Sequence, residues 1–149
     1  MKAQYNMSMN KNDWTYLAGF IDGEGNIGID KYSKYGKAIN YAIKVAISNT
    51  NRPILNWIQD YYGGYISTLK RKRPNYKECY QLTVRHLRAN RMLKDIEPYL
   101  KIKREIAQIA MRVEKRCQVK YDHRKSKPIE RQLVDEADYQ LVKSIISSK

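Results

Sequence analysis

The segment with the clearest potential for chemistry lies between residues 22 and 25, where two acidic residues alternate with glycine. Asp22 and Glu24 follow apolar residues at helical spacing, so their carboxylates lie at the carbonyl end of a predicted helix, where the helix dipole is negative. A cluster of oxygen ligands suits a hard divalent cation. Spacing alone leaves a second interpretation open, in which Asp22 binds backbone amides in the turn and Glu24 is a solvated surface acid.

Other constellations of reactive residues are few. Cys79 and Cys117 lie far apart and form no Cys-x-x-Cys unit, which predicts ordinary thiols rather than a zinc site or a disulfide framework. Only two histidines are present, which excludes a histidine-rich metal centre. Gly23, Gly25 and Gly28 have the spacing of a dinucleotide-binding fingerprint, but a helix precedes them and a strand follows, the reverse of the required context.

The charge of the chain indicates a polyanionic partner. Its 149 residues include 29 Lys or Arg against 15 Asp or Glu, a net charge of +14. Such self-repulsion does not serve a fold and favours binding to nucleic acid. The length predicts a single domain. No secretory signal and no run of roughly 20 apolar residues is present. We therefore expect no membrane partner and an intracellular location, in the cytoplasm of a microbe or virus-infected cell or in an organelle.

The elements that must position the acidic segment begin with a helix over residues 13–22. Asp13 is its expected cap, and Gly23 and Gly25 are expected to end it. This helix is apolar nearly all round, which predicts burial on several sides. Gly19 and Gly23, four residues apart, would let another backbone approach closely.

The rest of the chain alternates between hairpins and helices. Pro53 lies in the first turn of a helix that Thr50 or Asn51 caps, and Pro74-Asn75 predicts a hairpin turn. The basic stretch 115–131 is the one candidate linker, a solvated loop or DNA-seeking arm. Periodicity predicts strands at 26–30, 41–48, 65–72 and 78–85, and helices at 53–62, 89–96, 102–117 and 129–146.

This order predicts an α+β fold, α-ββ-α-ββ-α, in a single domain over residues 1–149. Its core covers about residues 13–117, and a C-terminal helical extension covers about 118–149. The strands form an antiparallel sheet with helices packed on one face. The other face is then free to lie in a DNA major groove. Its polar side chains could bind base edges or phosphates: Asn26, Asp30, Lys44, Ser48, Gln81, Thr83 and Arg85.

The acidic segment also carries a resemblance to a known family. The run is Leu17-Ala18-Gly19-Phe20-Ile21-Asp22-Gly23-Glu24-Gly25. It closely resembles the motif that names the LAGLIDADG homing endonucleases, with departures at Phe20, Gly23 and Glu24. The likeness extends through the order of elements over about residues 13–117, while the residues after it have no clear counterpart.

The resemblance implies a saddle-shaped sheet in the major groove and cleavage of both DNA strands across the minor groove with Mg²⁺. Family members pair two copies of the motif helix at a two-fold or pseudo-two-fold axis. Because this chain holds one copy, the resemblance implies a homodimeric, intron-encoded endonuclease with a long, roughly palindromic double-stranded DNA target. The dimer contact is expected at Leu17, Ala18, Gly19, Asp22 and Gly23.

The resemblance also implies roles for individual residues. Glu24 matches the metal-binding acid, beside a backbone carbonyl near Gly23, and Asn49 matches a residue that orients water. Lys103 matches a basic residue near the start of a late helix that stabilises the transition state or holds solvent. Asn49 as a turn residue and Lys103 as a surface cation remain alternatives. Some relatives have a further basic residue where this chain has Pro53, so Arg52 takes that role or the role is absent.

Basic and aromatic residues of both hairpins are expected to grip phosphates at the groove edge. Such contacts confer affinity and salt sensitivity, whereas polar residues of the sheet confer sequence choice. Alone, the basic run 70–73 fits a solvated turn equally well. The expected phosphate-binding residues are Lys31, Tyr32, Lys34, Tyr35, Lys37, Lys70, Arg71, Lys72 and Arg73.

Two further functions compete with cleavage. The same fold could serve an RNA-splicing maturase or a non-cleaving DNA-binding regulator, but such a module has no need of an acid at Glu24. A general basic coat protein for nucleic acid would have no defined target. The expected enzyme is therefore a Mg²⁺-dependent, site-specific DNA endonuclease.

Overall fold

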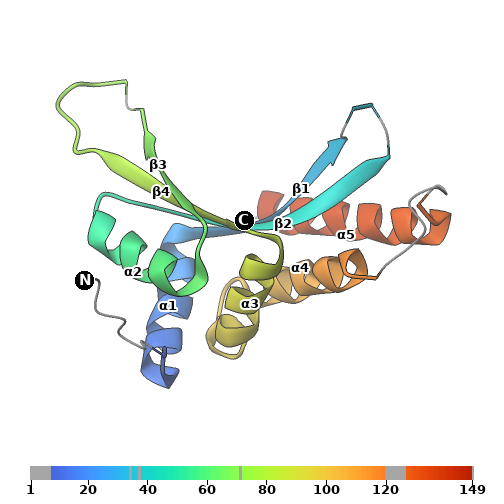
Figure 1. Cartoon of the computed structure of the whole chain (residues 1–149), viewed down its shortest axis with the longest axis horizontal. Helices are drawn as coiled ribbons and strands as arrows, with labels where there is room; N and C mark the ends of the chain where they lie inside the picture. Colours follow the sequence, from blue (N-terminus) through green and yellow to red (C-terminus); the bar gives the residue numbers. More distant parts are fainter. Residues whose placement is uncertain (1–7, 34, 37, 71, 120–126, 149) are drawn as a thin grey trace, which may run out of the picture.

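A four-stranded antiparallel sheet carries helices on one of its faces, as shown in the computed structural model (Figure 1). The structure describes residues 8–33, 35–36, 38–70, 72–119 and 127–148. The strand order is β1-β2-β4-β3, and two hairpins rise from the middle of the sheet like the ends of a saddle. This arrangement confirms the predicted α+β fold. The elements are α1 (Lys11–Glu24), β1 (Gly25–Ser33), β2 (Ile39–Asn49), α2 (Arg52–Tyr62), β3 (Tyr65–Leu69), β4 (Cys79–Arg85), α3 (His86–Ile96), η1 (Glu97–Tyr99), α4 (Arg104–Cys117) and α5 (Ile129–Ser147).

The first helix is longer than the sequence pattern predicted. Asn10, not Asp13, is its cap: the Asn10 side chain accepts the N–H groups of Asn12 and Asp13. In turn, the carboxylate of Asp13, at the third helical position, accepts the backbone N–H of Asn10 at 3.0 Å, which completes a capping box. The helix also continues through Gly23. It ends at Gly25, where a Cβ atom would lie 2.9 Å from the carbonyl oxygen of Ile21.

Other boundaries shift for identifiable reasons. Asn51 caps α2 as expected, with its side chain 3.2 Å from the backbone nitrogen of Ile54. The second hairpin is shorter than predicted because its ladder ends at the pair Leu69 and Cys79. The helix α4 begins at Arg104 rather than at residue 102. Both ends of the expected linker 115–131 are helical, and residues 120–126 lie outside the described part.

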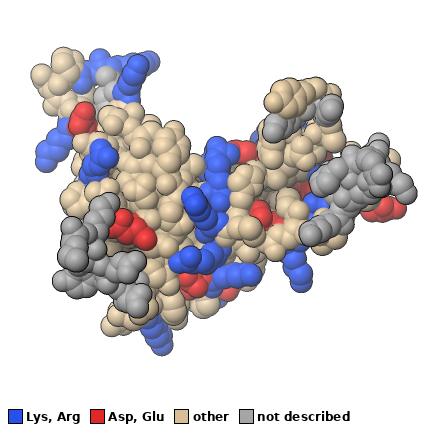
Figure 2. All heavy atoms as spheres, in the orientation of Figure 1, with Lys and Arg blue, Asp and Glu red and all other residues tan. Residues whose placement is uncertain are grey.

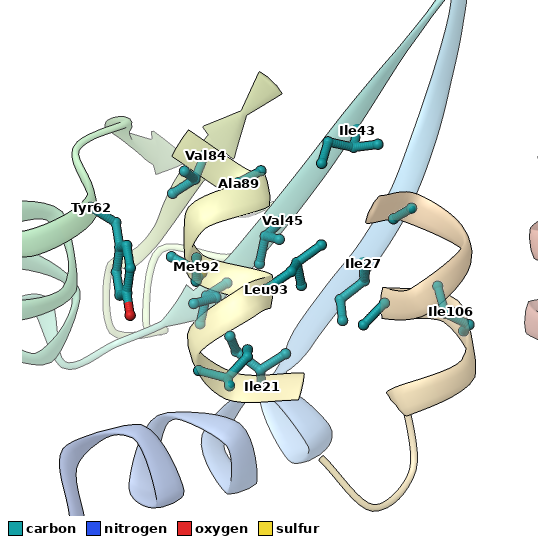
Figure 3. Close-up of a cluster of buried hydrophobic side chains, with 14 of the residues drawn as sticks. Ile21, Ile27, Ile43, Val45, Tyr62, Val84, Ala89, Met92, Leu93 and Ile106 are labelled. Carbon is teal, nitrogen blue, oxygen red and sulfur yellow. The ribbon is translucent and has the colours of Figure 1, made fainter. Parts of the chain in front are cut away.

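The hydrophobic core joins the inner face of the sheet to α1, α3 and α4 (Figure 3). Ile21 of α1, Ile43 of β2 and Leu93 of α3 are fully buried, and Ile106 of α4 is 3 % exposed. The end of α1 is therefore held by packing from the sheet and from two helices. Among the described residues, no helix has the length and apolar content to cross a membrane. Cys79 and Cys117 are free thiols.

The last helix, α5, is attached to α4 by a buried ionic network. Asp135 is 0 % exposed and lies 2.8 Å from Arg116 and 2.9 Å from Lys127. Asp138 binds Arg112 and Arg116. Burial acts to lower the pKa of Arg116, but its bonds to both aspartates outweigh this and raise that pKa. These ion pairs hold α5 against α4, although α5 lies after the residues that carry the family resemblance.

Candidate active site and nucleic-acid interface

The end of α1 is anchored by Asp22. Its carboxylate accepts the backbone N–H groups of Lys101, Ile102 and Lys103 at 2.7, 3.1 and 3.0 Å. Partial burial acts to raise the pKa of Asp22, but these three bonds and the charge of Lys103 outweigh it and lower the pKa. Asp22 therefore binds amides, as one interpretation expected, although they belong to the loop before α4 and not to its own turn.

The Lys103 side chain reaches the same end of α1. Its ammonium donates to the carbonyl oxygen of Ile21 at 3.0 Å and to that of Asp22. A cation at the carbonyl end of a helix is favoured by the helix dipole. Lys103 is half-buried, so it is not the surface cation of the alternative interpretation. The fold thus places an ammonium group beside the acidic segment, from a loop about eighty residues away in the chain.

Glu24 remains exposed at the junction of α1 and β1. Lys103 occupies the carbonyls of Ile21 and Asp22, and the carbonyl of Gly23 is the next one along the helix. Within the described residues, no group of three or more His, Cys, Asp or Glu side chains could hold a metal ion. Because Asp22 is committed to backbone amides, one chain offers a metal the carboxylate of Glu24 as its acidic ligand at this point.

Asn49 is the last residue of β2, as predicted. Because Gly25 pairs with Ile47 in an antiparallel ladder, the last residues of β2 lie beside the first residues of β1, next to Glu24. The side-chain oxygen of Asn49 accepts the backbone N–H of Asn51 at 2.8 Å. Asn49 therefore serves as a turn residue at the place where the resemblance expects a water-orienting one.

Arg52 is the first residue of α2, shortly after the end of β2. Its guanidinium carbon lies 5.1 Å from the centre of the Tyr80 ring, within the range of a cation–π contact. Tyr80 is in turn the cross-strand partner of Asn49. Arg52 thus packs beside the candidate site from α2.

The open face of the sheet is concave and polar. Asn26, Lys44, Gln81, Thr83 and Arg85 line a hollow in it, as the sequence pattern predicted. Tyr65 also lines this hollow and was missed, although its pairing with Thr83 follows from the alternation along β3. Polar side chains from several strands therefore converge on one surface.

The sequence pattern suggested that Asp30 contacts DNA, but its carboxylate is engaged within the protein. Its carboxylate binds Lys44 at 2.8 Å and Arg85 at 2.6 Å. Partial burial acts to raise the pKa of Asp30, but the bonds and charges of these two cations outweigh it and lower the pKa. Asp30 instead organises the two cations on the open face. On the same face Gln81 donates to Ser48 at 3.1 Å.

The tip of the β3–β4 hairpin carries exposed basic residues. Lys70, Lys72 and Arg73 are exposed, and Figure 2 shows Lys and Arg atoms gathered at this tip. In the other hairpin, Tyr32 is 43 % exposed, whereas Lys31 pairs with Glu136 of α5 at 2.8 Å. The expected phosphate-binding residues Lys34, Lys37 and Arg71 lie outside the described residues.

One side of α1 is exposed. Gly19 and Gly23 are exposed, and apart from their own helix turn no described residue has an atom within 4 Å of the position that a Cβ atom would take at either glycine. Leu17 and Ala18 are 0 % exposed inside the chain, so their side chains cannot form the expected dimer contact. The Asp22 carboxylate is likewise engaged within the chain. The expected contact is therefore reduced to the two glycines.

Aromatic residues flank these glycines. Tyr16 is 54 % exposed and stacks on Phe20, with 6.1 Å between ring centres. Trp57 of α2 meets Tyr16 edge-on at 6.2 Å. The sequence pattern placed Tyr16 and Phe20 on a neighbouring helical stripe, but it gave no sign that Trp57 would join them.

Comparison with known proteins identifies a family. A sequence model described as LAGLIDADG endonuclease matches residues 17–101. No curated protein matches the sequence.

Solved structures of homing endonucleases share the fold. One is I-CvuI in complex with an I-CreI target in the presence of Mg, with the DNA not cleaved: TM-score 0.71, 20 % identity, 91 % of this chain and 82 % of that one. I-TnaI has TM-score 0.51 and 16 % identity, over 95 % of this chain and 99 % of that one. The archaeal intron-encoded I-Vdi141I, complexed with DNA, has TM-score 0.50 and 16 % identity, over 90 % of this chain and 96 % of that one.

Proposed function

This chain belongs to the LAGLIDADG endonuclease family, whose members cut DNA at specific sites, and we propose that two copies of it cleave both strands of a long, roughly palindromic duplex with Mg²⁺. The enzyme is intron-encoded and cuts across the minor groove. The observation that carries this proposal is the construction of the α1 end. Asp22 and Lys103 hold the backbone there, while Glu24 projects from the same turn and remains exposed.

A second copy docks on the exposed side of α1. Gly19 and Gly23 leave this side without bulk, so a partner helix can approach at close range. Tyr16 and Phe20 then supply apolar area at the border of the contact. Dimerisation on this side brings together two copies of Glu24, one from each subunit.

The donor chemistry of this turn fits Mg²⁺, which prefers oxygen ligands and retains several waters. In each subunit, Glu24 and the carbonyl of Gly23 would hold the ion. The single carboxylate that one chain offers supports a site that is complete only in the dimer. When bound, Mg²⁺ polarises the scissile phosphate, lowers the pKa of the attacking water and neutralises the leaving oxygen.

The chain's own residues position these groups. Asp22 ties the end of α1 to the loop before α4 by three hydrogen bonds to backbone N–H groups. The backbone that carries Glu24 is therefore held in place. Lys103 places positive charge beside the scissile phosphate, where it stabilises the developing negative charge. Asn49, which accepts the backbone N–H of Asn51, orients water at the end of β2. Arg52 supplies the basic group that Pro53, with its apolar side chain, cannot supply.

The saddle binds the DNA. Asn26, Gln81 and Thr83 line the hollow and are positioned to read base edges in the major groove. Lys70, Lys72 and Arg73 at the β3–β4 tip contact phosphates and supply affinity. The retained acid at Glu24 supports cleavage over a binding-only role.

The test is cleavage of a randomised duplex library with Mg²⁺, followed by sequencing of the cut ends. Once a site is known, Glu24→Gln should still bind it and lower the cleavage rate about a hundredfold or more, the scale for removing one transition-state contact. Glu130→Gln is the matched control, because Glu130 is also an exposed acid on a helix, and within the described residues its helix α5 has no contact with α1. Full cleavage by Glu24→Gln would reject the metal assignment.

A further inference from the structure

The saddle does not account for all of the chain's positive charge. On its open face Lys44 and Arg85 are already paired with Asp30. Figure 2 shows Lys and Arg atoms continuing from the valley between the hairpins down over α3. The exposed cations of the helical layer include Arg88, Arg91, Lys94, Arg104, Arg112 and Lys115.

Several of these cations converge on a groove between α3 and α4, called here the α3–α4 groove. Lys94 lines it from α3, and Arg112 and Lys115 line it from α4. Lys94 and Lys115 form no ion pair with any described residue. Arg112 uses one guanidinium nitrogen to bind Asp138 at 3.0 Å, yet 57 % of its side chain remains exposed. The groove therefore has positive charge that ion pairs among the described residues do not neutralise.

The lining also offers hydrogen-bonding groups. Asn90 is 7 % exposed, and its side-chain oxygen has no hydrogen-bond partner among the described residues. Gln108 and Gln118 also line the groove, but their side chains are engaged within the protein: the Gln108 amide donates to Glu97 at 3.0 Å, and Gln118 bonds Glu114. A buried carboxamide without its partner is uncommon, because such groups are normally satisfied by protein, water or ligand. The cations suit phosphate oxygens, and the acceptor oxygen of Asn90 suits a sugar hydroxyl.

The position of the groove separates it from the saddle. The helices α3 and α4 pack on the inner face of the sheet, opposite to the open face (Figure 1). A duplex that lies in the saddle does not reach the outer side of these helices. We propose that the α3–α4 groove binds the phosphodiester backbone of a second nucleic-acid segment.

The test uses short single-stranded RNA and DNA of one mixed sequence, labelled with fluorescein and carrying a photoreactive thiopyrimidine. Crosslinked peptides from the wild-type chain should include α3 and α4, and K94E/K115E should abolish these crosslinks. For this variant, the slope of log Kobs against log salt should become shallower by about 1.4, which is about 0.7 for each of two phosphate contacts. The matched control K11E/K143E reverses two exposed lysines outside the groove and should leave both measurements unchanged.

Crosslinks with RNA alone assign the second segment to RNA, and crosslinks with both probes assign recognition to the shared backbone. The proposal is overturned if neither probe crosslinks to α3 or α4, or if the control pair lowers crosslinking as much. It is also overturned if unlabelled polyglutamate displaces the probes as well as unlabelled oligonucleotide does, which would indicate an acidic protein partner. K94Q/K115Q repeats the test if circular dichroism shows that the reversed pair is unfolded.

This binding measurement does not depend on cleavage. A chain that binds RNA through the groove and cuts no duplex in the library would reject the proposed endonuclease and leave the groove proposal standing. Conversely, K94E/K115E should cut the library at wild-type positions, because neither lysine lies at the α1 end.

Discussion

The two hairpins of the saddle differ in length and in support. The strands β1 and β2 have 9 and 11 residues, whereas β3 and β4 have 5 and 7. The first hairpin is attached to α5: Glu136 binds both Lys31 and Tyr41, and the Tyr41 ring lies 5.9 Å from that of Tyr139. The second hairpin instead presents exposed lysines at its tip.

This difference separates two tasks. Lys31 and Tyr41 of the first hairpin are engaged by α5, which holds the hairpin in place relative to the core. The cations of the second hairpin tip are available for phosphates. We therefore expect changes under the first hairpin to alter folding stability, and changes at the second tip to alter DNA affinity.

The largest effect is expected from Asp135→Ala, beneath the first hairpin. This substitution leaves Lys127 without its buried carboxylate partner and leaves Arg116 with Asp138 alone, and breaking such a buried pair costs about 3–5 kcal/mol. Urea denaturation should show this decrease in the free energy of unfolding. Asp60→Ala, which removes an exposed acid on α2, is the control and should change the value little. Equal stability of the two variants would contradict the role assigned to α5.

A smaller effect, and of another kind, is expected from Lys70→Gln with Lys72→Gln. Two phosphate contacts are lost, so the slope of log Kobs against log salt for duplex DNA should fall by about 1.8. Urea denaturation should give an unchanged free energy of unfolding, because both side chains are exposed. An unchanged salt slope would show that this tip does not touch DNA.

The smallest effect concerns pH and the attachment of the first hairpin to α5. Hydrogen bonds from Gln140, Lys31 and Tyr41 lower the pKa of Glu136 to about 2. Because the folded pKa lies below the unfolded value of about 4.3, the stabilisation is complete above that value and is lost as the pH falls toward 2. Glu136→Gln should therefore melt below wild type at neutral pH, and the gap should close toward pH 2. A gap that is constant with pH would contradict the assignment.

Much of the fold followed from local patterns. The alternation of Ile27 and Ile29 predicted β1, and Asn51 before Pro53 predicted the start of α2. The cap of α1 was misplaced because Asn10 and Asp13 are both good capping residues, and their order in the capping box depends on geometry. The position of Glu24 at a helix end followed from the motif, whereas the engagement of Asp30 did not.

The sequence by itself determined which segments are helices and strands, that the chain carries a single acidic motif, and that its excess charge is positive. These properties depend on neighbours a few residues apart and on composition. The tertiary structure alone decided that Asp22 and Lys103 bind at the same helix end, that Asp30 pairs with Arg85, and that Asp135 of α5 is buried beside Arg116 of α4. Each of these contacts joins different elements, and packing of the core, not spacing along the chain, brings the partners within hydrogen-bond distance.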